Sequence, residues 1–143
     1  MYLYRHPPEA VTRALLTACG LPTADLTAWH FEHFFGCGST ENPQGVVGLE
    51  LFDSCALLRS LAVAAEHRGL GCGQALVAAA ERYARDKGVR ELYLLTTTAE
   101  EFFLRLGYRE AERKSAPEPI RKTKEFSDLC PETSVFMVKK LDG

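Results

Sequence analysis

Residues 68–73, Arg-Gly-Leu-Gly-Cys-Gly, are the most informative stretch of this chain. They follow an apolar run at residues 57–63 and precede a helix-like stretch at residues 74–87. Glycine tolerates the backbone angles that turn successive N–H groups inward, and a helix start adds unpaired N–H donors and a positive dipole end. The order of strand, glycine-rich turn and helix predicts a phosphate or pyrophosphate site, although a plain strand-to-helix turn has a similar composition.

Two common nucleotide motifs do not fit this turn. A Walker loop would continue with Lys-Ser or Lys-Thr, whereas Gln74 and Ala75 follow here. A dinucleotide-binding fingerprint would space its glycines as Gly-x-Gly-x-x-Gly and place an acidic residue after the next strand. The glycines here alternate, and the apolar stretch at residues 92–95 ends in threonines.

The turn resembles the Arg/Gln-x-x-Gly-x-Gly/Ala loop of the GNAT superfamily of N-acetyltransferases, which holds the pyrophosphate of acetyl-coenzyme A. Residues 99–108, Ala-Glu-Glu-Phe-Phe-Leu-Arg-Leu-Gly-Tyr, are similar to the second signature of that superfamily, Ala-x-x-Phe-Tyr-x-x-x-Gly-Phe. Together the two motifs extend the resemblance over residues 46–110. Residues 56–63, 91–98 and 126–131 further resemble one branch, the arsenic-resistance N-acetyltransferase-like proteins encoded beside arsenic-detoxification genes.

The composition predicts one globular domain over residues 1–143, because 46% of the residues are hydrophobic and 25% are charged. A net charge of −2 gives no electrostatic reason to expect nucleic acid or a membrane surface as a partner. The chain has no signal-peptide pattern and no apolar run near the roughly 20 residues that span a bilayer. We therefore expect a cytoplasmic protein, with a homodimer left open.

The sequence contains five cysteines, an odd number, without a Cys-x-x-Cys or Cys/His ligand pattern. This pattern favours small buried thiols in a reducing compartment. The branch resemblance suggests a second interpretation, a trio of thiols for trivalent arsenic, against which the wide spacings argue. The cysteines are Cys19, Cys37, Cys55, Cys72 and Cys130.

Apolar periodicity and turn residues predict a mixed order of elements. Strands are expected at residues 2–4, 31–37, 46–52, 56–64, 92–95, 108–113 and 135–140, and turns at 42–45 and 53–54. Helices are expected at residues 8–20, 25–30, 74–87 and around 102–106, with a short one within 117–130. Gly88 is expected in a left-handed conformation after its helix, and residues 108–113 and 135–140 as an antiparallel pair.

This order predicts an α/β (α+β) fold, three layers with a mixed central sheet of about six or seven strands and about four helices. The GNAT resemblance implies the same fold. It also implies that the strands ending near Val63 and Leu95 splay apart, so that the pantetheine arm of the cofactor inserts between them.

The resemblance further implies which residues hold acetyl-coenzyme A. Backbone N–H groups of the glycine turn would bind the pyrophosphate, with an arginine adding charge or shaping the loop, and the preceding strand would hydrogen-bond the pantetheine. The expected cofactor residues are Leu61, Ala62, Val63, Arg68, Gly69, Gly71, Cys72, Gly73, Gln74, Thr96, Phe102 and Phe103. No metal is expected.

Two positions depart from the superfamily pattern. The usual tyrosine, often the acid that protonates the departing thiolate, aligns with Phe103, which cannot donate a proton. The usual asparagine aligns with Thr96. A coenzyme A thiol resembles cysteine, with a pKa of about 8.5, so that the thiolate can leave without an acid. Alternatively, Thr96, Thr97 or Tyr108 substitutes for it.

Amine acetylation also needs a base, because a protonated amine is not a nucleophile. Glu50 is the leading candidate, since it interrupts the apolar strand at residues 46–52. Alternation puts Glu50 on one face with Gly48 and Phe52, where it is either a base or a solvent-facing carboxylate.

Four further polar residues are candidates for the site. Arg59 and Ser60 interrupt the next strand and should point to opposite faces. Arg59 would pair with Glu50 or clamp a substrate carboxylate, and Ser60 joins Glu50 and Tyr108 as a catalytic candidate. His30 and His33 are alternative bases or substrate contacts, although a lone histidine is more often structural.

The resulting hypothesis is an enzyme that moves acetyl from acetyl-coenzyme A to the primary amine of a small molecule. The branch resemblance suggests an amino-acid-like, phosphinothricin-like or arsenic-containing acceptor. Two alternatives stay open: an acyl-coenzyme A sensor without chemistry, which Phe103 would permit, and an enzyme that acetylates proteins or peptides.

Overall fold

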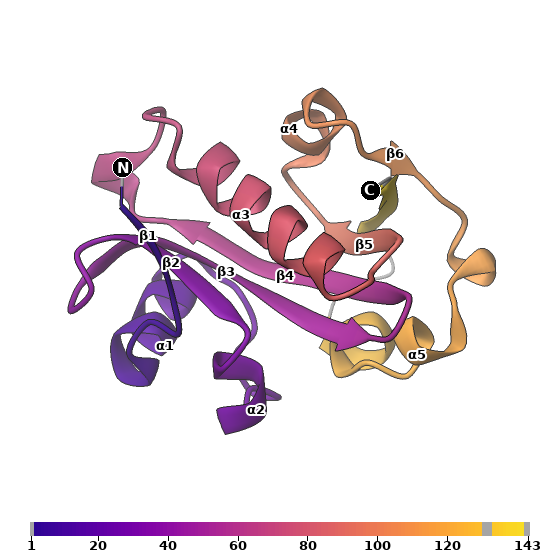
Figure 1. Cartoon of the computed structure of the whole chain (residues 1–143), viewed down its shortest axis with the longest axis horizontal. Helices are drawn as coiled ribbons and strands as arrows, with labels where there is room; N and C mark the ends of the chain where they lie inside the picture. Colours follow the sequence, from indigo (N-terminus) through magenta and orange to yellow (C-terminus); the bar gives the residue numbers. More distant parts are fainter. Residues whose placement is uncertain (1, 130–132, 142–143) are drawn as a thin grey trace. The chain divides into compact units, whose positions relative to one another are not determined.

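The computed structural model describes residues 2–129 and 133–141 of the 143. In the described part, seven strands form one mixed sheet in the order β1-β2-β3-β4-β5-β7-β6, which confirms the predicted fold class (Figure 1). The strands are β1 (Leu3–Arg5), β2 (Phe34–Gly38), β3 (Pro43–Phe52), β4 (Cys55–Val63), β5 (Glu91–Thr96), β6 (Arg109–Glu110) and β7 (Val135–Lys140). The α-helices are α1 (Glu9–Ala18), α2 (Ala28–Phe31), α3 (Cys72–Asp86), α4 (Glu100–Arg105) and α5 (Glu118–Arg121).

Contacts within the chain define two compact units. The first comprises Met1–Glu50 and Leu58–Tyr83, and the second comprises Leu51–Leu57 and Ala84–Gly143. The expectation of a single domain over residues 1–143 stays a prediction. Of the described helices, none combines the length and the apolarity that crossing a membrane would need.

In the first unit, β1, β2 and β3 are antiparallel neighbours, with α1 and α2 on one face and α3 on the other (Figure 1). Successive residues of β2 show the alternation that produces these layers. The Phe34 ring packs 5.2 Å from the Phe31 ring, in a cluster that includes Leu16 of α1. The Phe35 ring instead lies 5.3 Å from the ring of Tyr83 in α3.

Two elements of the first unit begin later than predicted. The helix expected at residues 25–30 is only Ala28–Phe31, because Thr27 starts it: the Thr27 backbone N–H donates to His30 Nδ1 over 3.0 Å. Asp25 therefore lies on the preceding loop. The strand expected from residue 31 begins at Phe34, since Phe31 belongs to the helix.

A disulfide joins Cys37 of β2 to Cys72, the first residue of α3. Both residues are buried as expected, but the expectation that all the cysteines are thiols is wrong for this pair. The two residues are 35 positions apart, and only the packing of α3 over the sheet brings them together. Cys19 and Cys55 are free thiols, whereas Cys130 lies outside the described residues.

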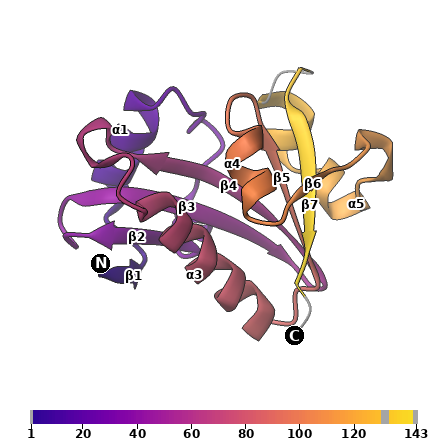
Figure 2. The ribbon, with the colours of Figure 1, turned by 90° about the horizontal axis from the view of Figure 1, so that it is seen from above.

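In the second unit, β5 is parallel to the start of β4 and antiparallel to β7 (Figure 2). The β4–β5 register runs from Cys55↔Glu91 to Leu57↔Tyr93. The splay expected further along these strands stays a prediction. The core of this unit packs α5 against the strands through Leu57, Tyr93, Ile120, Phe136 and Val138.

The last strand pair is antiparallel as predicted but shorter. The strand β6 covers only Arg109–Glu110, and one further backbone hydrogen bond runs from the Ala111 N–H to the Phe136 carbonyl over 2.8 Å before the 3-10 turn at Arg113–Ser115. Between that turn and β7, a π-helical turn (Glu125–Leu129) follows α5, which agrees with the short helix expected there. Gly88 ends its helix with a φ of +92°, the left-handed conformation predicted from the sequence.

Candidate functional site

A buried ion-pair network lies in the first unit, where β3 and β4 carry Glu50 and Arg59. Glu50 is 5% exposed and Arg59 is 3% exposed. Arg59 Nη1 donates to Glu50 Oε2 over 2.8 Å, which confirms the pairing interpretation of Arg59. Arg59 also donates two hydrogen bonds to the Asp25 carboxylate, from Nη1 to Oδ2 over 2.5 Å and from Nη2 to Oδ1 over 3.0 Å.

Sequence reasoning missed Asp25. The expected helix at residues 25–30 would have given it an ordinary first-turn position. The only available signal was that Asp25 is the one acidic residue between Glu9 and Glu32. Burial alone would raise the pKa of Asp25, but hydrogen bonds from Arg59 and its positive charge outweigh burial and lower that pKa.

Ser60 lies on the same side of β4 as Arg59, contrary to the expectation of opposite faces. Its φ of +60° is left-handed, which interrupts the alternation of the strand at this residue. The Ser60 Oγ accepts a hydrogen bond from Arg59 Nε over 3.1 Å. Ser60 thus orients Arg59, and its proposed catalytic role stays a prediction.

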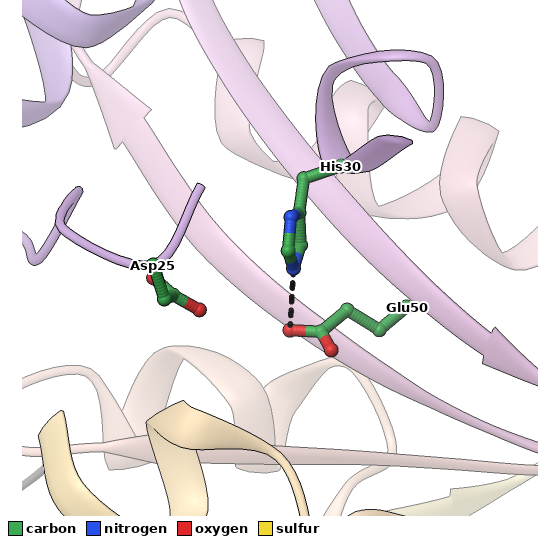
Figure 3. A group of neighbouring side chains, drawn as sticks. All are labelled: Asp25, His30 and Glu50. Carbon is green, nitrogen blue, oxygen red and sulfur yellow. Dashed lines mark ion pairs between the residues drawn. The ribbon is translucent and has the colours of Figure 1, made fainter. Parts of the chain in front are cut away.

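His30 points its ring at Glu50 (Figure 3), with Nε2 3.7 Å from Oε2. Because Nδ1 accepts the backbone N–H of Thr27, the neutral ring carries its proton on Nε2. Burial lowers the pKa of His30, and the nearby Glu50 carboxylate opposes this only in part, so the ring is neutral at pH 7. His30 therefore directs an N–H toward Glu50, and the Nε2 atom that faces the site has no lone pair with which to act as a base.

Asp25, His30 and Glu50 also offer three ligand atoms within 4.8 Å of one another (Figure 3). Such a set can suit a metal ion. Here Arg59 Nη1 contacts both carboxylates directly, so that the guanidinium already supplies the positive charge between them. The donor set therefore fits an internal ion-pair network better than a metal centre.

His33 is separate from the ion-pair network among the described contacts. Its Nδ1 lies 3.1 Å from the carbonyl oxygen of Trp29, and the two rings are 5.5 Å apart. Trp29, 43% exposed, also stacks edge-on against His30 at 4.9 Å. The substrate-contact roles of His30 and His33 stay predictions.

The glycine turn lies in the first unit and has room for a ligand. Gly69 and Gly71 have φ values of +80° and +86°, and a β-carbon at either would meet nothing within 4 Å. Arg68 Nε donates to the Val63 carbonyl over 3.1 Å, so that Arg68 joins the turn to the end of β4. This contact matches the loop-shaping alternative for Arg68.

The remaining turn and strand candidates occupy adjoining positions. Gly73 and Gln74 follow Cys72 in the first turn of α3, and Leu61, Ala62 and Val63 form the end of β4. Their contacts with a cofactor stay predictions.

The other candidates belong to the second unit. Thr96 Oγ1 accepts the backbone N–H of Ala99 over 3.0 Å, just before α4. Phe103 is 5% exposed, and its ring packs edge-on against Phe102 at 5.0 Å and Tyr108 at 5.4 Å. Phe103 therefore supplies packing, and the cofactor roles of Thr96, Phe102 and Phe103 stay predictions, as does the catalytic role of Tyr108.

Comparison with known families settles the relationship suggested by the two motifs. The model of the Acetyltransferase (GNAT) family matches residues 5–108, more than half of the chain. The chain belongs to the GNAT acetyltransferase family. An uncharacterised N-acetyltransferase of Chlorobaculum tepidum is 43% identical over 65 residues, which are 46% of this chain and 41% of that relative.

Solved structures show the same fold in GNAT-like proteins. N-acetylglutamate synthase of Neisseria gonorrhoeae, solved with coenzyme A and N-acetyl-glutamate, has a TM-score of 0.85 at 22% identity. That match covers 100% of this chain and 36% of the synthase chain. A Mycobacterium tuberculosis protein solved with coenzyme A has a TM-score of 0.78 at 19% identity, covering 99% of this chain and 100% of that one.

Replacing Phe103 by Tyr tests whether this GNAT position only packs. We expect the variant to fold, with turnover unchanged or raised, because a hydroxyl is added where the superfamily has one. The buried hydroxyl should cost at most about 1–3 kcal/mol of unfolding free energy. Urea unfolding and thiol release from acetyl-coenzyme A measure the two effects.

The matched control for this change is Tyr108→Phe, which removes a hydroxyl from the neighbouring ring. A selective fall in turnover with Tyr108→Phe would identify Tyr108 as the substitute acid. A large fall in turnover with Phe103→Tyr at unchanged stability would contradict the packing role.

Proposed function

We propose that this GNAT protein transfers acetyl from acetyl-coenzyme A to the primary amine of a small molecule by direct attack. The observation that carries the proposal is the placement of Glu50. Its carboxylate is buried, and among the described residues its contacts with Arg59 and His30 both go to Oε2. Oε1 thus keeps its lone pairs for a proton from the substrate.

In the proposed reaction, Glu50 Oε1 accepts a proton from the substrate ammonium, and the freed amine attacks the thioester carbonyl carbon. A C–N bond forms, the C–S bond breaks, and coenzyme A leaves as a thiolate. A thiol with a pKa of about 8.5 leaves without an acid near neutral pH. Backbone N–H groups stabilise the oxyanion that forms on the carbonyl oxygen.

The glycine turn would bind the pyrophosphate of acetyl-coenzyme A. Its support is the pair of left-handed glycines, the open space beside them and the start of α3 at Cys72. Binding of coenzyme A itself has support from structural neighbours that were solved with it. At this helix start, Cys72 can offer its backbone N–H to the pyrophosphate but not its side chain, because its sulfur is in the disulfide.

The identity of the acceptor is a finer proposal. An amino-acid-like acceptor has support from the neighbouring synthase, which was solved with N-acetyl-glutamate. The phosphinothricin-like or arsenic-containing acceptor rests on the branch resemblance alone. The cytoplasmic location, the homodimer and the absence of nucleic-acid or membrane partners also stay predictions.

A panel of small amines, amino acids and short peptides tests the proposal against its alternatives. Thiol release from acetyl-coenzyme A should require a small amine. Calorimetric binding of acetyl-coenzyme A without release under any condition would indicate a sensor. Release with peptides alone would indicate a protein or peptide acetyltransferase.

Replacing Gly71 by Glu should abolish most binding of acetyl-coenzyme A. The substitution adds a negative charge where the pyrophosphate is expected and puts a β-carbon on a backbone with a φ of +86°. Loss of a charge-assisted phosphate site corresponds to at least about a tenfold rise in the dissociation constant. Isothermal calorimetry measures it.

The matched control is Gly88→Glu, at the other end of α3. Gly88 also has a positive φ, +92°, and open space beside it, so that the strain and the added charge are similar. We expect this control to bind acetyl-coenzyme A like the parent. Equal affinities for both variants and the parent would refute the assignment of the turn.

A further inference from the structure

The disulfide of the first unit begins where the glycine turn ends. Cys72 follows Gly71 as the first residue of α3, and its sulfur is bonded to Cys37 of β2. Cys72 is 2% exposed and Cys37 is 0% exposed, whereas residues 68–71 just before Cys72 are all exposed. Cys37 is itself paired with Gly45 of the next strand, β3. A covalent bond therefore joins the exposed turn, at the point where it becomes a helix, to a buried strand of the sheet.

The surroundings of this disulfide are filled. A β-carbon on Gly45 would lie 2.7 Å from Cys72 Sγ, so that this sulfur packs directly against the backbone of β3. The same point is 3.1 Å from the Ala62 carbonyl oxygen and 3.1 Å from Leu76 Cδ1. Two thiols need more room than one disulfide, because their sulfur atoms are no longer bonded to each other. Since Cys37 and Gly45 belong to paired strands, we expect the movement on reduction to fall on Cys72.

The position of Cys72 decides which way the N–H groups of the helix start point. The first N–H groups of a helix have no partner within it. Ala75 donates to the Gly71 carbonyl over 3.0 Å, so the N–H groups of residues 72–74 precede that hydrogen bond. They bind one pyrophosphate together only while they keep a common direction. Helix ends open more readily than helix centres, and the cross-link at Cys72 opposes this opening.

We propose that the Cys37–Cys72 disulfide is a redox switch that sets the affinity of the glycine turn for acetyl-coenzyme A. The oxidised protein binds the cofactor more tightly, and reduction by a dithiol weakens binding because it releases the start of α3. The inference rests on the proposed function, in which the turn holds the pyrophosphate. It adds control by thiol reductants to that function.

The reduction is a two-electron exchange between thiols and a disulfide. A thiolate of the dithiol attacks Cys72 Sγ and bonds to it, while Cys37 leaves as a thiolate and takes a proton. The second thiol of the reductant then displaces Cys72, which is protonated in turn, and the reductant becomes a cyclic disulfide. Because Cys72 is only 2% exposed, the attack requires local opening of the helix start. A cofactor that binds only the closed turn opposes this opening.

The first test measures the binding of desulfo-coenzyme A to the oxidised and the reduced parent protein by calorimetry. This probe keeps the pyrophosphate but has neither a thiol nor a thioester, so it cannot react with the cysteines. The protein is reduced with a dithiol, and its mass after alkylation confirms that Cys37 and Cys72 are both thiols. The dissociation constant should rise at least about fivefold on reduction, the lower end of usual coupling between two sites.

Two variants separate the bond from other effects of the reductant. The double variant Cys37→Ala/Cys72→Ala keeps every other cysteine and should bind the probe equally with and without reductant. Leu57→Ala removes core packing from the second unit, so it lowers stability while the disulfide stays intact. It should bind the probe like the oxidised parent. All affinities refer to folded protein and are measured well below the unfolding midpoint of each protein.

The second test uses the reverse effect, because a bound cofactor must oppose reduction by the same factor by which reduction opposes binding. The parent is equilibrated in dithiothreitol buffers of graded redox ratio, with and without saturating desulfo-coenzyme A, and its thiols are counted by mass after alkylation. The probe should lower the reduction potential of the disulfide by at least about 20 mV, which is fivefold at about 30 mV per tenfold change for two electrons. A disulfide that only stabilised the fold would show no such shift.

The outcomes separate this inference from the proposed function. Equal affinity of the oxidised and reduced parent, or a reduction potential that the probe leaves unchanged, would overturn the switch while leaving acetyl transfer intact. A response to reductant in the double variant, or equally weakened binding in Leu57→Ala, would do the same. An oxidised parent that does not bind the probe would overturn the assignment of the glycine turn, and the switch with it.

Discussion

Replacing Glu50 by Gln is expected to lower kcat by about 10²–10⁴-fold, the usual contribution of a general base. Glutamine keeps the size of the side chain but cannot take a proton from the substrate ammonium. The fold should survive, because Asp25 still binds Arg59 through both terminal nitrogens and the amide oxygen can accept from Nη1. Thiol release at saturating amine measures kcat, and calorimetry should show unchanged affinity for acetyl-coenzyme A.

Two further variants make this result specific. Glu41→Gln removes the same charge from an exposed loop and should leave kcat unchanged. Glu50→Asp keeps a carboxylate but withdraws it by one methylene, so it should retain more kcat than Glu50→Gln. Parent-like turnover in Glu50→Gln would reduce Glu50 to a structural residue and move the search for a base to His30, His33 or a chain of waters.

Breaking the Cys37–Cys72 disulfide is expected to lower the unfolding free energy by about 4 kcal/mol. The bond closes a loop between residues 35 positions apart, and the cross-link restricts the unfolded chain. The effect should appear in urea unfolding as the difference between oxidised and reduced parent protein. Because Cys72 begins α3, reduction should also increase amide exchange in the first turn of that helix.

The double variant Cys37→Ala/Cys72→Ala separates the cross-link from the packing of the sulfur atoms. The unfolding free energy of the double variant should not depend on reductant. The unfolding free energy of the parent should fall on reduction, toward the value of the double variant. Cys55→Ala, at a buried free thiol, should keep the full response to reductant. If the mass of the parent protein shows that the disulfide is reduced but the unfolding free energy does not fall, the role assigned to the disulfide is contradicted.

Several elements could be predicted because their causes are local. The spacing of apolar residues predicted α3, and Gly88 was predicted at its left-handed end. Alternation in β3 put Glu50 on one face with Gly48, and the structure agrees: a β-carbon on Gly48 would meet the Phe34 ring, which faces α1 and α2. The motifs at residues 68–73 and 99–108 were sufficient to indicate the GNAT family.

The surroundings of Glu50 could not be predicted in the same way. Asp25 lies 34 positions from Arg59 in the sequence. The two meet because α2 begins only after Thr27, which leaves Asp25 on the preceding loop, and because Arg13 donates a hydrogen bond to the backbone of that loop. The side of β4 on which Ser60 lies depends on its positive φ. That φ could not be predicted from the residue type, serine.

The sequence by itself determined the order of helices and strands, the glycine turn and the place of Glu50 within an apolar strand, because periodicity and turn chemistry are properties of neighbouring residues. Only the tertiary structure decided that Cys37 bonds to Cys72 and that Asp25, Arg59, His30 and Glu50 form one network. The physical reason is that a buried charge or thiol takes its partner from whichever segment folding packs against it, irrespective of separation along the chain.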